Sequence, residues 1–314
     1  MAELILHHFP ASPFAEKVRL VLAYKRLACK SVIVPQIMPK PDVLALTGGY
    51  RKTPFLQIGA DIYCDTALIC DVLEQLQPTP TLYVQPGLAL ARILAQWADS
   101  TLFWAAVTYN RGPKTAGHGL GGALPTIPAD IFADRKAMGF NVEWLTPADA
   151  TPAYQTYLAR LADLLQTQPY LLGQQPCIAD FCAYHPLWMV HLRVPAALHL
   201  LEHAPSVKRW LERMRSIGQC SMPELTASDA IGIAAQAEPV PLGQGPLTDT
   251  TVQDQHGIAL GSPVTVAAES FGLEPSAGEL VAATRTHYTL RRTDPRAGTV
   301  HVHFPRIGYV LKTS

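Results

Sequence analysis

The sequence lacks a net charge. It holds 25 Lys and Arg residues against 25 Asp and Glu residues, so its formal net charge at pH 7 is zero. Nucleic acids and anionic membrane surfaces attract proteins that carry a basic surface field. The charge balance therefore argues against both classes of partner. The sequence also lacks the run of about 20 apolar residues that a membrane-spanning helix needs.

Cysteine pairs of the CxxC type are missing as well. The spacing of the six cysteines predicts no zinc site, and four of them lie in apolar runs, which is typical of small buried side chains in a reducing compartment. The opening residues, MAELILHHFP, have no basic region and only a short apolar run, so they do not predict a signal peptide. We therefore expect a soluble cytoplasmic protein.

The first segment, residues 1–80, alternates strand and helix patterns. Short apolar runs predict strands, and apolar residues that recur on one face of a helix follow Ser12. The predicted order is β-α-β, a connecting stretch, then β-β-α, which resembles the order of a thioredoxin-like domain. The strands are expected over 4–9 and 29–34 and in a hairpin over 54–65, and the helices after Ser12 and over 66–76.

The rest of the chain divides into a helical part and a strand-rich part. Residues 88–222 carry long apolar helical faces, interrupted by a Gly/Pro-rich insertion at 111–128, and predict an all-helical bundle. Residues 246–314 alternate with period two and predict a small all-β domain. Residues 223–245 are interpreted as a linker with no apolar periodicity, so residues 1–225 are expected to fold alone. The expected fold class is a multidomain α+β protein.

Four motifs occur in an order and spacing that resemble the glutathione transferases, across residues 1–220. The start of the first helix is most similar to the omega class, which carries a cysteine where this chain has Ser12, and to the tau class, which carries a serine. Residues 230–314 show no such resemblance. The four motifs are SPFAEKVRLVL (12–22), KPDVLALTGGYRKTPFL (40–56), IYCDTALICDVLEQL (62–76) and LLGQQPCIADFCAYHPLW (171–188).

Ser12 has two compatible interpretations. Ser12 followed by Pro13 is a common way to cap and begin a helix. The resemblance implies in addition a catalytic role, in which the Ser12 hydroxyl and the helix N-terminus stabilise the thiolate of bound glutathione. A serine cannot form the mixed disulfide that the omega cysteine forms, so the expected chemistry is thiolate activation.

The resemblance also implies a set of glutathione-binding residues. A cis bond between Thr53 and Pro54 is expected to turn the Thr53 backbone toward the cysteinyl part of glutathione. Asp65 and Thr66 are expected to hold the γ-glutamyl end at the start of a helix. Lys40 matches an omega lysine that pairs with the glycyl carboxylate.

Other residues leave alternatives open. Arg51 and Lys52 compete with Lys40 for the glycyl carboxylate. Tyr109 is a weak candidate for the second-substrate pocket, because most aromatic residues at helical spacing belong to the core. A histidine trio in the β domain could bind a metal, but it is more often the solvated face of a strand, and we predict no metal site. The trio is His287, His301 and His303.

The leading hypothesis is a glutathione transferase that conjugates glutathione, as cosubstrate, to a small electrophile, as in detoxification. Family members pair around a two-fold axis, so the resemblance implies a homodimer. The alternative is a non-catalytic protein of the same fold that binds a protein partner through residues 246–314. A third possibility is that the β domain only covers the second-substrate site or the dimer surface. The sequence does not name the electrophile.

Overall fold

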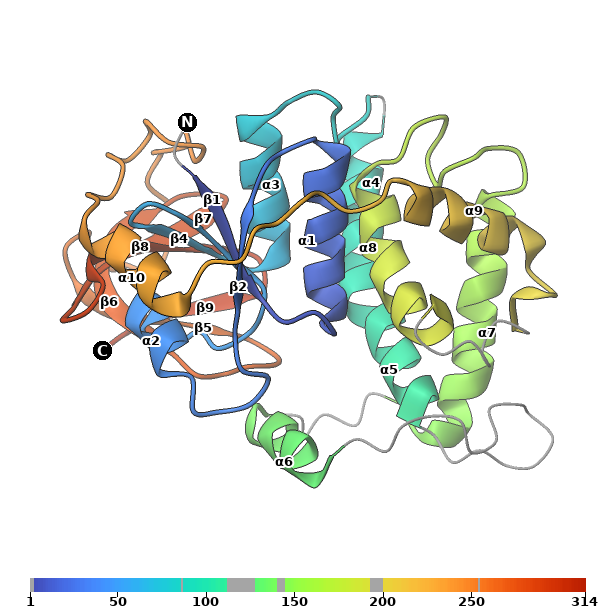
Figure 1. Cartoon of the computed structure of the whole chain (residues 1–314), viewed down its shortest axis with the longest axis horizontal. Coiled ribbons are helices and arrows are strands. Elements are labelled where there is room, and N and C mark those ends of the chain that lie inside the picture. The colour runs from blue at the N-terminus through green and yellow to red at the C-terminus, as the bar shows by residue number, and fades with distance from the viewer. Residues whose placement is uncertain (1–2, 86, 112–127, 140–144, 193–199, 254) are drawn as a thin grey trace.

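A computed structural model describes residues 3–85, 87–111, 128–139, 145–192, 200–253 and 255–314. The protein is a multidomain α+β structure, with a long sheet on one side and a helical bundle on the other (Figure 1). Among the described helices, a stretch both long enough and apolar enough to cross a bilayer is missing.

The N-terminal part has the predicted thioredoxin-like order, and the predicted connecting stretch contains one helix (Pro41–Thr47). Helices α1 and α3 cover the face of the sheet that meets the bundle, and α2 lies on the opposite face (Figure 1). Its elements are β1 (Leu4–His8), α1 (Pro13–Tyr24), β2 (Lys30–Ile33), α2 (Pro41–Thr47), β3 (Phe55–Ile58), β4 (Asp61–Cys64) and α3 (Thr66–Leu76).

The second part is the predicted helical bundle. The insertion at 112–127 falls outside the described residues. Two of the helical segments, η1 and η2, are short π-helical turns that continue α4 and α8. The elements are α4 (Leu88–Trp97), η1 (Ala98–Leu102), α5 (Phe103–Arg111), α6 (Ala129–Ala137), α7 (Pro147–Leu164), α8 (Ile178–Leu187), η2 (Trp188–Leu192) and α9 (Pro205–Ser216).

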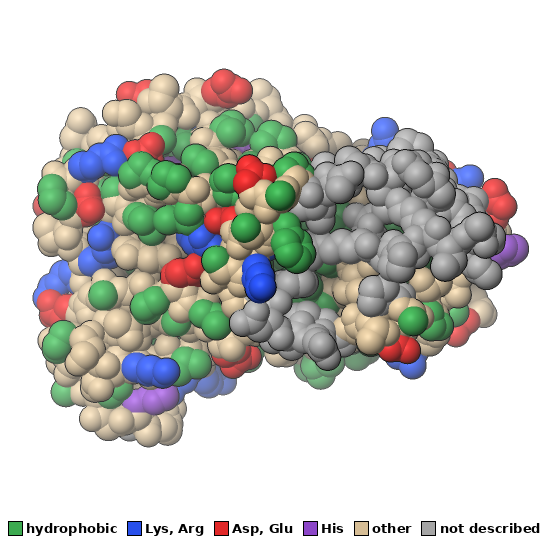
Figure 2. All heavy atoms as spheres, turned by 90° about the horizontal axis from the view of Figure 1, so that it is seen from below, with side chains coloured by type: hydrophobic (Ala, Val, Ile, Leu, Met, Phe, Trp, Pro, Cys, Tyr) green, Lys and Arg blue, Asp and Glu red, His purple; other side chains and the backbone are tan. Residues whose placement is uncertain are grey.

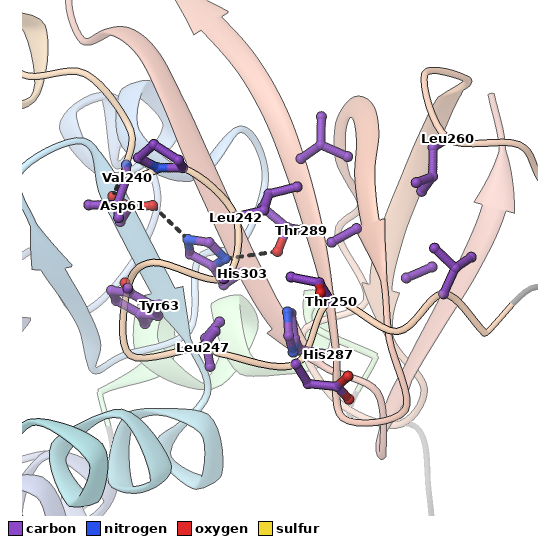
Figure 3. A pocket seen from close by; sticks show the side chains of 18 residues that line it. Asp61, Tyr63, Val240, Leu242, Leu247, Thr250, Leu260, His287, Thr289 and His303 are labelled. Atoms are coloured by element: carbon purple, nitrogen blue, oxygen red, sulfur yellow. Dashed lines mark hydrogen bonds and ion pairs between the residues drawn. The ribbon is translucent and has the colours of Figure 1, made fainter.

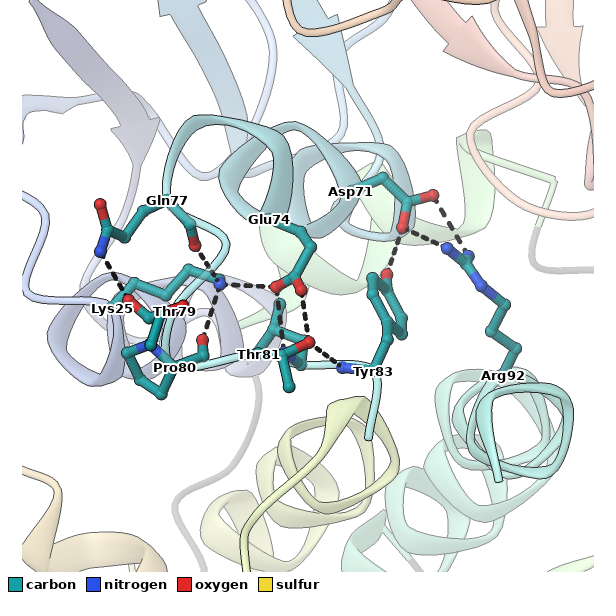
Figure 4. A network of polar contacts seen from close by, with 10 residues as sticks. Lys25, Asp71, Glu74, Gln77, Thr79, Pro80, Thr81, Tyr83 and Arg92 are labelled. Carbon is teal, nitrogen blue, oxygen red and sulfur yellow. Dashed lines mark hydrogen bonds and ion pairs between the residues drawn. The ribbon is translucent and has the colours of Figure 1, made fainter. Parts of the chain in front are cut away.

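A polar network surrounds the C-terminal half of α3, between the N-terminal part and the bundle (Figure 4). Lys25 at the end of α1 donates from Nζ to Glu74 Oε2 of α3 over 2.6 Å, and its side chain is fully buried. Arg92 of α4 donates to Asp71 of α3 over 2.8 Å, and the Tyr83 hydroxyl donates to the same carboxylate. Of these contacts, the Arg92–Asp71 pair links the N-terminal part to the bundle.

The C-terminal strands continue the N-terminal sheet. The strand order is β2-β1-β3-β4-β8-β7-β6-β5-β9, and β8 pairs in parallel with β4, so that Asp61 lies opposite His301 and Tyr63 opposite His303. These strands therefore extend the N-terminal sheet, whereas the sequence interpretation placed them in a separate small β domain. The strands are β5 (Pro263–Ala268), β6 (Ser276–Ala283), β7 (His287–Asp294), β8 (Gly298–Pro305) and β9 (Tyr309–Thr313).

The predicted linker contains a helix, α10 (Ala227–Ala235). Thr226 caps it by accepting a hydrogen bond from Asp229 N over 3.0 Å. Ala230, Ile231 and Ala234 are buried on the same face of the sheet as α2. One apolar core thus spans the boundary that the sequence interpretation placed between two domains.

The histidines of β8 are buried, whereas the sequence interpretation placed them on a solvated face. His301 is 9% exposed and His303 is 4% exposed. His303 donates or accepts at both ring nitrogens, 2.9 Å from Asp61 Oδ1 and 2.9 Å from Thr289 Oγ1 (Figure 3). The backbone N–H of Val240 donates to Asp61 Oδ2 over 2.9 Å. The network ties β4, β7 and β8 together, because each of its members comes from a different segment.

The surface is mixed in charge. On the described part of the face in Figure 2, Lys and Arg side chains are interspersed with Asp and Glu side chains. This pattern agrees with the zero net charge of the sequence.

Buried neutral histidines predict that acid destabilises the fold. Burial lowers the pKa of His7, His8 and His287 to about 4 from the ordinary 6.5. Between these values the unfolded chain binds protons that the native chain does not, so the free energy of unfolding falls as pH falls from 6.5 to 4. Each histidine contributes a slope of about 1.4 kcal/mol per pH unit. Urea unfolding at several pH values measures this slope.

The variant His7→Gln is expected to reduce the dependence of the unfolding free energy on pH by about 1.4 kcal/mol per pH unit, which corresponds to the uptake of about one proton. His203→Gln serves as the control, because the His203 side chain is exposed. A slope that does not change in His7→Gln contradicts the prediction.

Candidate functional site

A cavity of about 310 Å³ lies between the N-terminal part and the bundle. It borders the start of α1, the loop before β3, the start of α3, the helices η1 and α5, and the connection between β5 and β6. The six residues predicted to bind or activate glutathione all line it, namely Ser12, Lys40, Thr53, Pro54, Asp65 and Thr66.

Ser12 is the N-cap of α1. Its backbone is extended, Pro13 takes the first helical position, and Ser12 Oγ accepts a hydrogen bond from Ala15 N over 3.2 Å. The side chain is buried, at 3% exposure, yet borders the cavity. Capping uses an oxygen lone pair and leaves the hydroxyl hydrogen for another acceptor. The position also meets the partial positive charge of the helix N-terminus, which favours an anion.

The loop before β3 presents the backbone of Thr53 to the cavity. The Thr53–Pro54 peptide bond is cis, as the resemblance implies. Pro54 directly precedes β3, where a missing N–H is tolerated at a strand start.

Asp65 caps α3 in an unusual backbone conformation. Its φ of +75° is rarely adopted by residues other than glycine, and such residues persist where the surroundings fix them. Asp65 N donates to the Tyr50 hydroxyl over 3.0 Å, and Asp65 Oδ1 accepts from Ala67 N over 2.9 Å. Thr66 opens the helix beside it and is 5% exposed.

Three cations predicted near the glycyl carboxylate all line the cavity, but they differ in their partners. Arg51 forms ion pairs with Asp134 at 3.1 Å and with Glu274 at 2.7 Å. Within the described part of the chain, Lys40 and Lys52 have no carboxylate within 4.0 Å of the ammonium nitrogen. Lys40 Nζ donates to the backbone oxygen of Arg51 over 3.2 Å.

Burial makes both lysines easier to deprotonate. Burial, and then the neighbouring charge of Arg135, lower the pKa of Lys40 to about 8. Burial also lowers the pKa of Lys52. A ligand carboxylate would relieve this cost by supplying the missing counter-charge.

The other side of the cavity is aromatic. The Phe14 and Phe103 rings lie 4.7 Å apart, Phe103 meets Trp104 at 5.1 Å, and Trp104 meets Phe271 at 5.4 Å. Tyr109, predicted at the second-substrate pocket, is not among the described lining residues. Its ring stacks on Tyr154 at 4.9 Å inside the bundle, so Tyr109 belongs to the core there.

Asp99 lines the cavity, and the sequence analysis missed it. It lies in the π-helical turn η1 and accepts hydrogen bonds from Lys17 over 2.6 Å and from His185 over 2.9 Å. Burial opposes its ionisation, but Lys17 and His185 outweigh burial and hold the pKa of Asp99 below its usual range. The three residues come from distant parts of the chain, so no local pattern signals them.

A smaller cavity of about 100 Å³ borders the Asp61–His303 network (Figure 3). Among the described residues, Asp61, His301 and His303 are the group whose possible metal-ligand atoms lie within 4.8 Å of one another. Asp61 and His303 already bind each other and their neighbours. This group contains Asp61 in place of His287 of the predicted trio, and the absence of a metal site remains a prediction.

Comparisons with known proteins identify the family. Residues 6–81 match the model for the glutathione S-transferase N-terminal domain, and residues 146–217 match the model for the C-terminal domain. A GST-like protein from Pseudomonas syringae is 40% identical, with all of both chains covered and a TM-score of 0.82. The chain therefore belongs to the glutathione S-transferase-like family, and the likeness includes its C-terminal strands.

Two other similar proteins differ in what their names describe. FtsZ-localized protein A of Caulobacter vibrioides is 25% identical over 186 residues, which are 58% of this chain and 74% of that protein. A glutathione S-transferase of Methylobacterium radiotolerans, solved in complex with glutathione sulfonate, is 23% identical. The match covers 68% of this chain and 91% of the Methylobacterium chain, with a TM-score of 0.50. This likeness shows that the two proteins share a fold.

Proposed function

We propose that this protein is a glutathione-dependent transferase of omega- or tau-like type that joins glutathione to a small electrophile. The observation that supports this function most is that all six glutathione residues implied by the sequence border one cavity. The opposite side of that cavity is apolar and aromatic, as a site for an uncharged second substrate requires.

In the proposed reaction Ser12 and the N-terminus of α1 stabilise the thiolate. A free thiol has a pKa of about 8.5, and a hydrogen bond to the sulfur lowers this pKa toward neutral pH. The thiol proton passes to solvent. The sulfur lone pair then forms the C–S bond, and the leaving group departs with the electron pair of the bond that breaks. The Ser12 hydroxyl donates to the sulfur until that bond forms.

The other cavity residues would hold the peptide. The Thr53 backbone pairs with the cysteinyl unit, Asp65 faces the γ-glutamyl ammonium, and Thr66 meets the γ-glutamyl carboxylate at the start of α3. The glycyl carboxylate goes to Lys40 or Lys52, because Arg51 already has two carboxylate partners. Reduced glutathione is a cytosolic pool, so this function places the protein in the cytoplasm. We also propose a homodimer, as in the family.

Asp65→Asn is expected to weaken glutathione binding. Wild type should bind with a dissociation constant between about 1 μM and 1 mM. Loss of the counter-charge to a buried ammonium should raise that constant by about tenfold or more. Isothermal titration calorimetry measures both values, with Asp163→Asn as the control because Asp163 is exposed. An absence of binding heat in wild type at millimolar glutathione overturns the proposed function.

A second candidate is a non-catalytic protein that binds a protein partner through its C-terminal strands. The relative named FtsZ-localized protein A favours it, because that name describes association with another protein. Turnover of glutathione with 1-chloro-2,4-dinitrobenzene separates the two candidates. Glutathione binding without turnover favours the second.

A further inference from the structure

The C-terminal strands reach the proposed glutathione site at two places. The first is Tyr309, which opens β9 and is 6% exposed. The second is the connection between β5 and β6, residues 269–275, from which Ser270 and Phe271 line the cavity. The transferase N-terminal model ends at residue 81 and the C-terminal model at residue 217, so neither includes these residues.

Tyr309 fixes the second oxygen of Asp65. Its hydroxyl donates to Asp65 Oδ2 over 3.0 Å, while Asp65 Oδ1 accepts from Ala67 N over 2.9 Å. With both oxygens held, the carboxylate has one orientation toward the cavity. Burial, and then Asp65, raise the pKa of Tyr309, so the hydroxyl stays protonated and remains a donor.

Tyr309 also lies beside Lys52. The Lys52 ammonium nitrogen is 4.9 Å from the centre of the Tyr309 ring and 5.4 Å from that of Tyr50. Such positions over aromatic faces stabilise a cation without a carboxylate. Asp65 is therefore bound by the Tyr309 hydroxyl and not by the Lys52 ammonium. This leaves Asp65 for the γ-glutamyl ammonium of the ligand and leaves Lys52 for a ligand carboxylate.

The 269–275 connection is anchored on the segment that precedes Thr53. A Cβ atom at Gly49 would lie 1.9 Å from the backbone oxygen of Pro275, so only glycine permits this approach. The Ser276 hydroxyl accepts from Tyr50 N over 3.0 Å, and Glu274 pairs with Arg51 at 2.7 Å. Phe271 is thereby held against Trp104 of α5 and closes the aromatic side of the cavity.

We propose that the C-terminal strands complete the transferase site, with Tyr309 as a positioning residue for Asp65 and Phe271 as a wall that selects planar aromatic electrophiles. This inference rests on the proposed function and deepens it. Aromatic rings gain from edge and offset contacts with other rings, so an aromatic electrophile benefits from Phe271 and an aliphatic one does not.

The first test removes the Tyr309 hydroxyl. Tyr309→Phe keeps the ring under Lys52 and is expected to raise the dissociation constant of glutathione about tenfold, as expected for loss of a charge-assisted hydrogen bond. Cysteinylglycine, which lacks the γ-glutamyl unit, should bind wild type and variant equally. A general disturbance of the site would weaken both ligands and would overturn the positioning role. The control is Tyr288→Phe, whose hydroxyl contacts His256 instead.

The second test changes the aromatic wall. Phe271→Leu is expected to lower the ratio of kcat/KM for 1-chloro-2,4-dinitrobenzene to kcat/KM for iodoacetamide about fivefold. Equal losses with both electrophiles overturn the selectivity. If wild type binds glutathione and Tyr309→Phe binds it equally well, this inference fails while the proposed function stands. If wild type does not bind glutathione, both fail.

Discussion

A chain that ends at residue 225 is expected to be insoluble or unfolded. The deletion removes β8, which pairs along β4, and so leaves β4 as an exposed, apolar sheet edge. It also removes more than half of one apolar core, including Val300, Val302 and Phe304. Each buried side chain of this kind contributes about 1.5–3 kcal/mol. The part of that core that remains on β1, β3, β4 and α2 would lose its cover and face water.

Soluble yield and thermal unfolding followed by circular dichroism measure the effect of the truncation. Coexpression of residues 226–314 as a separate fragment is the matched control, and it should restore solubility by supplying β8 in trans. A soluble fragment of residues 1–225 that binds glutathione contradicts the prediction. That result would support the separate β domain expected from the sequence.

Ser12→Ala is expected to lower turnover about 10²-fold and to leave glutathione bound. Loss of one preorganised donor to a developing or stable anion has an effect of this size. Binding should persist, because Thr53, Asp65 and Thr66 still line the cavity. Loss of the cap should also lower the free energy of unfolding by roughly 1 kcal/mol. The deciding measurement is the ultraviolet absorbance of the bound thiolate against pH, in wild type and variant.

Two outcomes separate the roles of Ser12. Overlapping thiolate titrations would reduce Ser12 to a helix cap, and the activating group would have to be another residue. A titration displaced to higher pH in Ser12→Ala supports the donor role. Ser12→Cys is the companion variant, and it should gain thiol–disulfide exchange because a cysteine at a helix N-terminus is the better nucleophile.

The residues expected at the site came from short local motifs that resemble those of glutathione transferases. Ser12 before a helix, Thr53 before a proline and Asp65 at a hairpin end each have a nearby signal, and all three residues line the cavity. A local signal also preceded helix α10, because Thr226 and Asp229 have the spacing of a capping box. The Ala- and Gly-rich composition around these two residues was nevertheless interpreted as a linker.

The remaining features depend on contacts between distant residues. Tyr309 meets Asp65 across 244 positions of the chain, and Asp99 meets His185 across 86. The alternating pattern of residues 246–314 predicted strands, but it carries no information about which sheet edge they join. The burial of the β8 histidines was missed for a similar reason. A strand inside a sheet can be covered on both faces, and the alternation of residue types does not show whether the second face is covered.

Because β4 pairs with β8, the sheet cannot be completed until the C-terminal strands have been synthesised. Asp61 leaves the ribosome about 240 residues before its partner His301. At roughly 5–20 residues per second, the first four strands wait roughly 10–50 s with one edge unpaired. During that interval the nascent sheet exposes the kind of edge on which other chains aggregate. Completion of the proposed glutathione pocket is therefore among the last steps of biogenesis, and a stalled chain has neither a finished sheet nor a finished site.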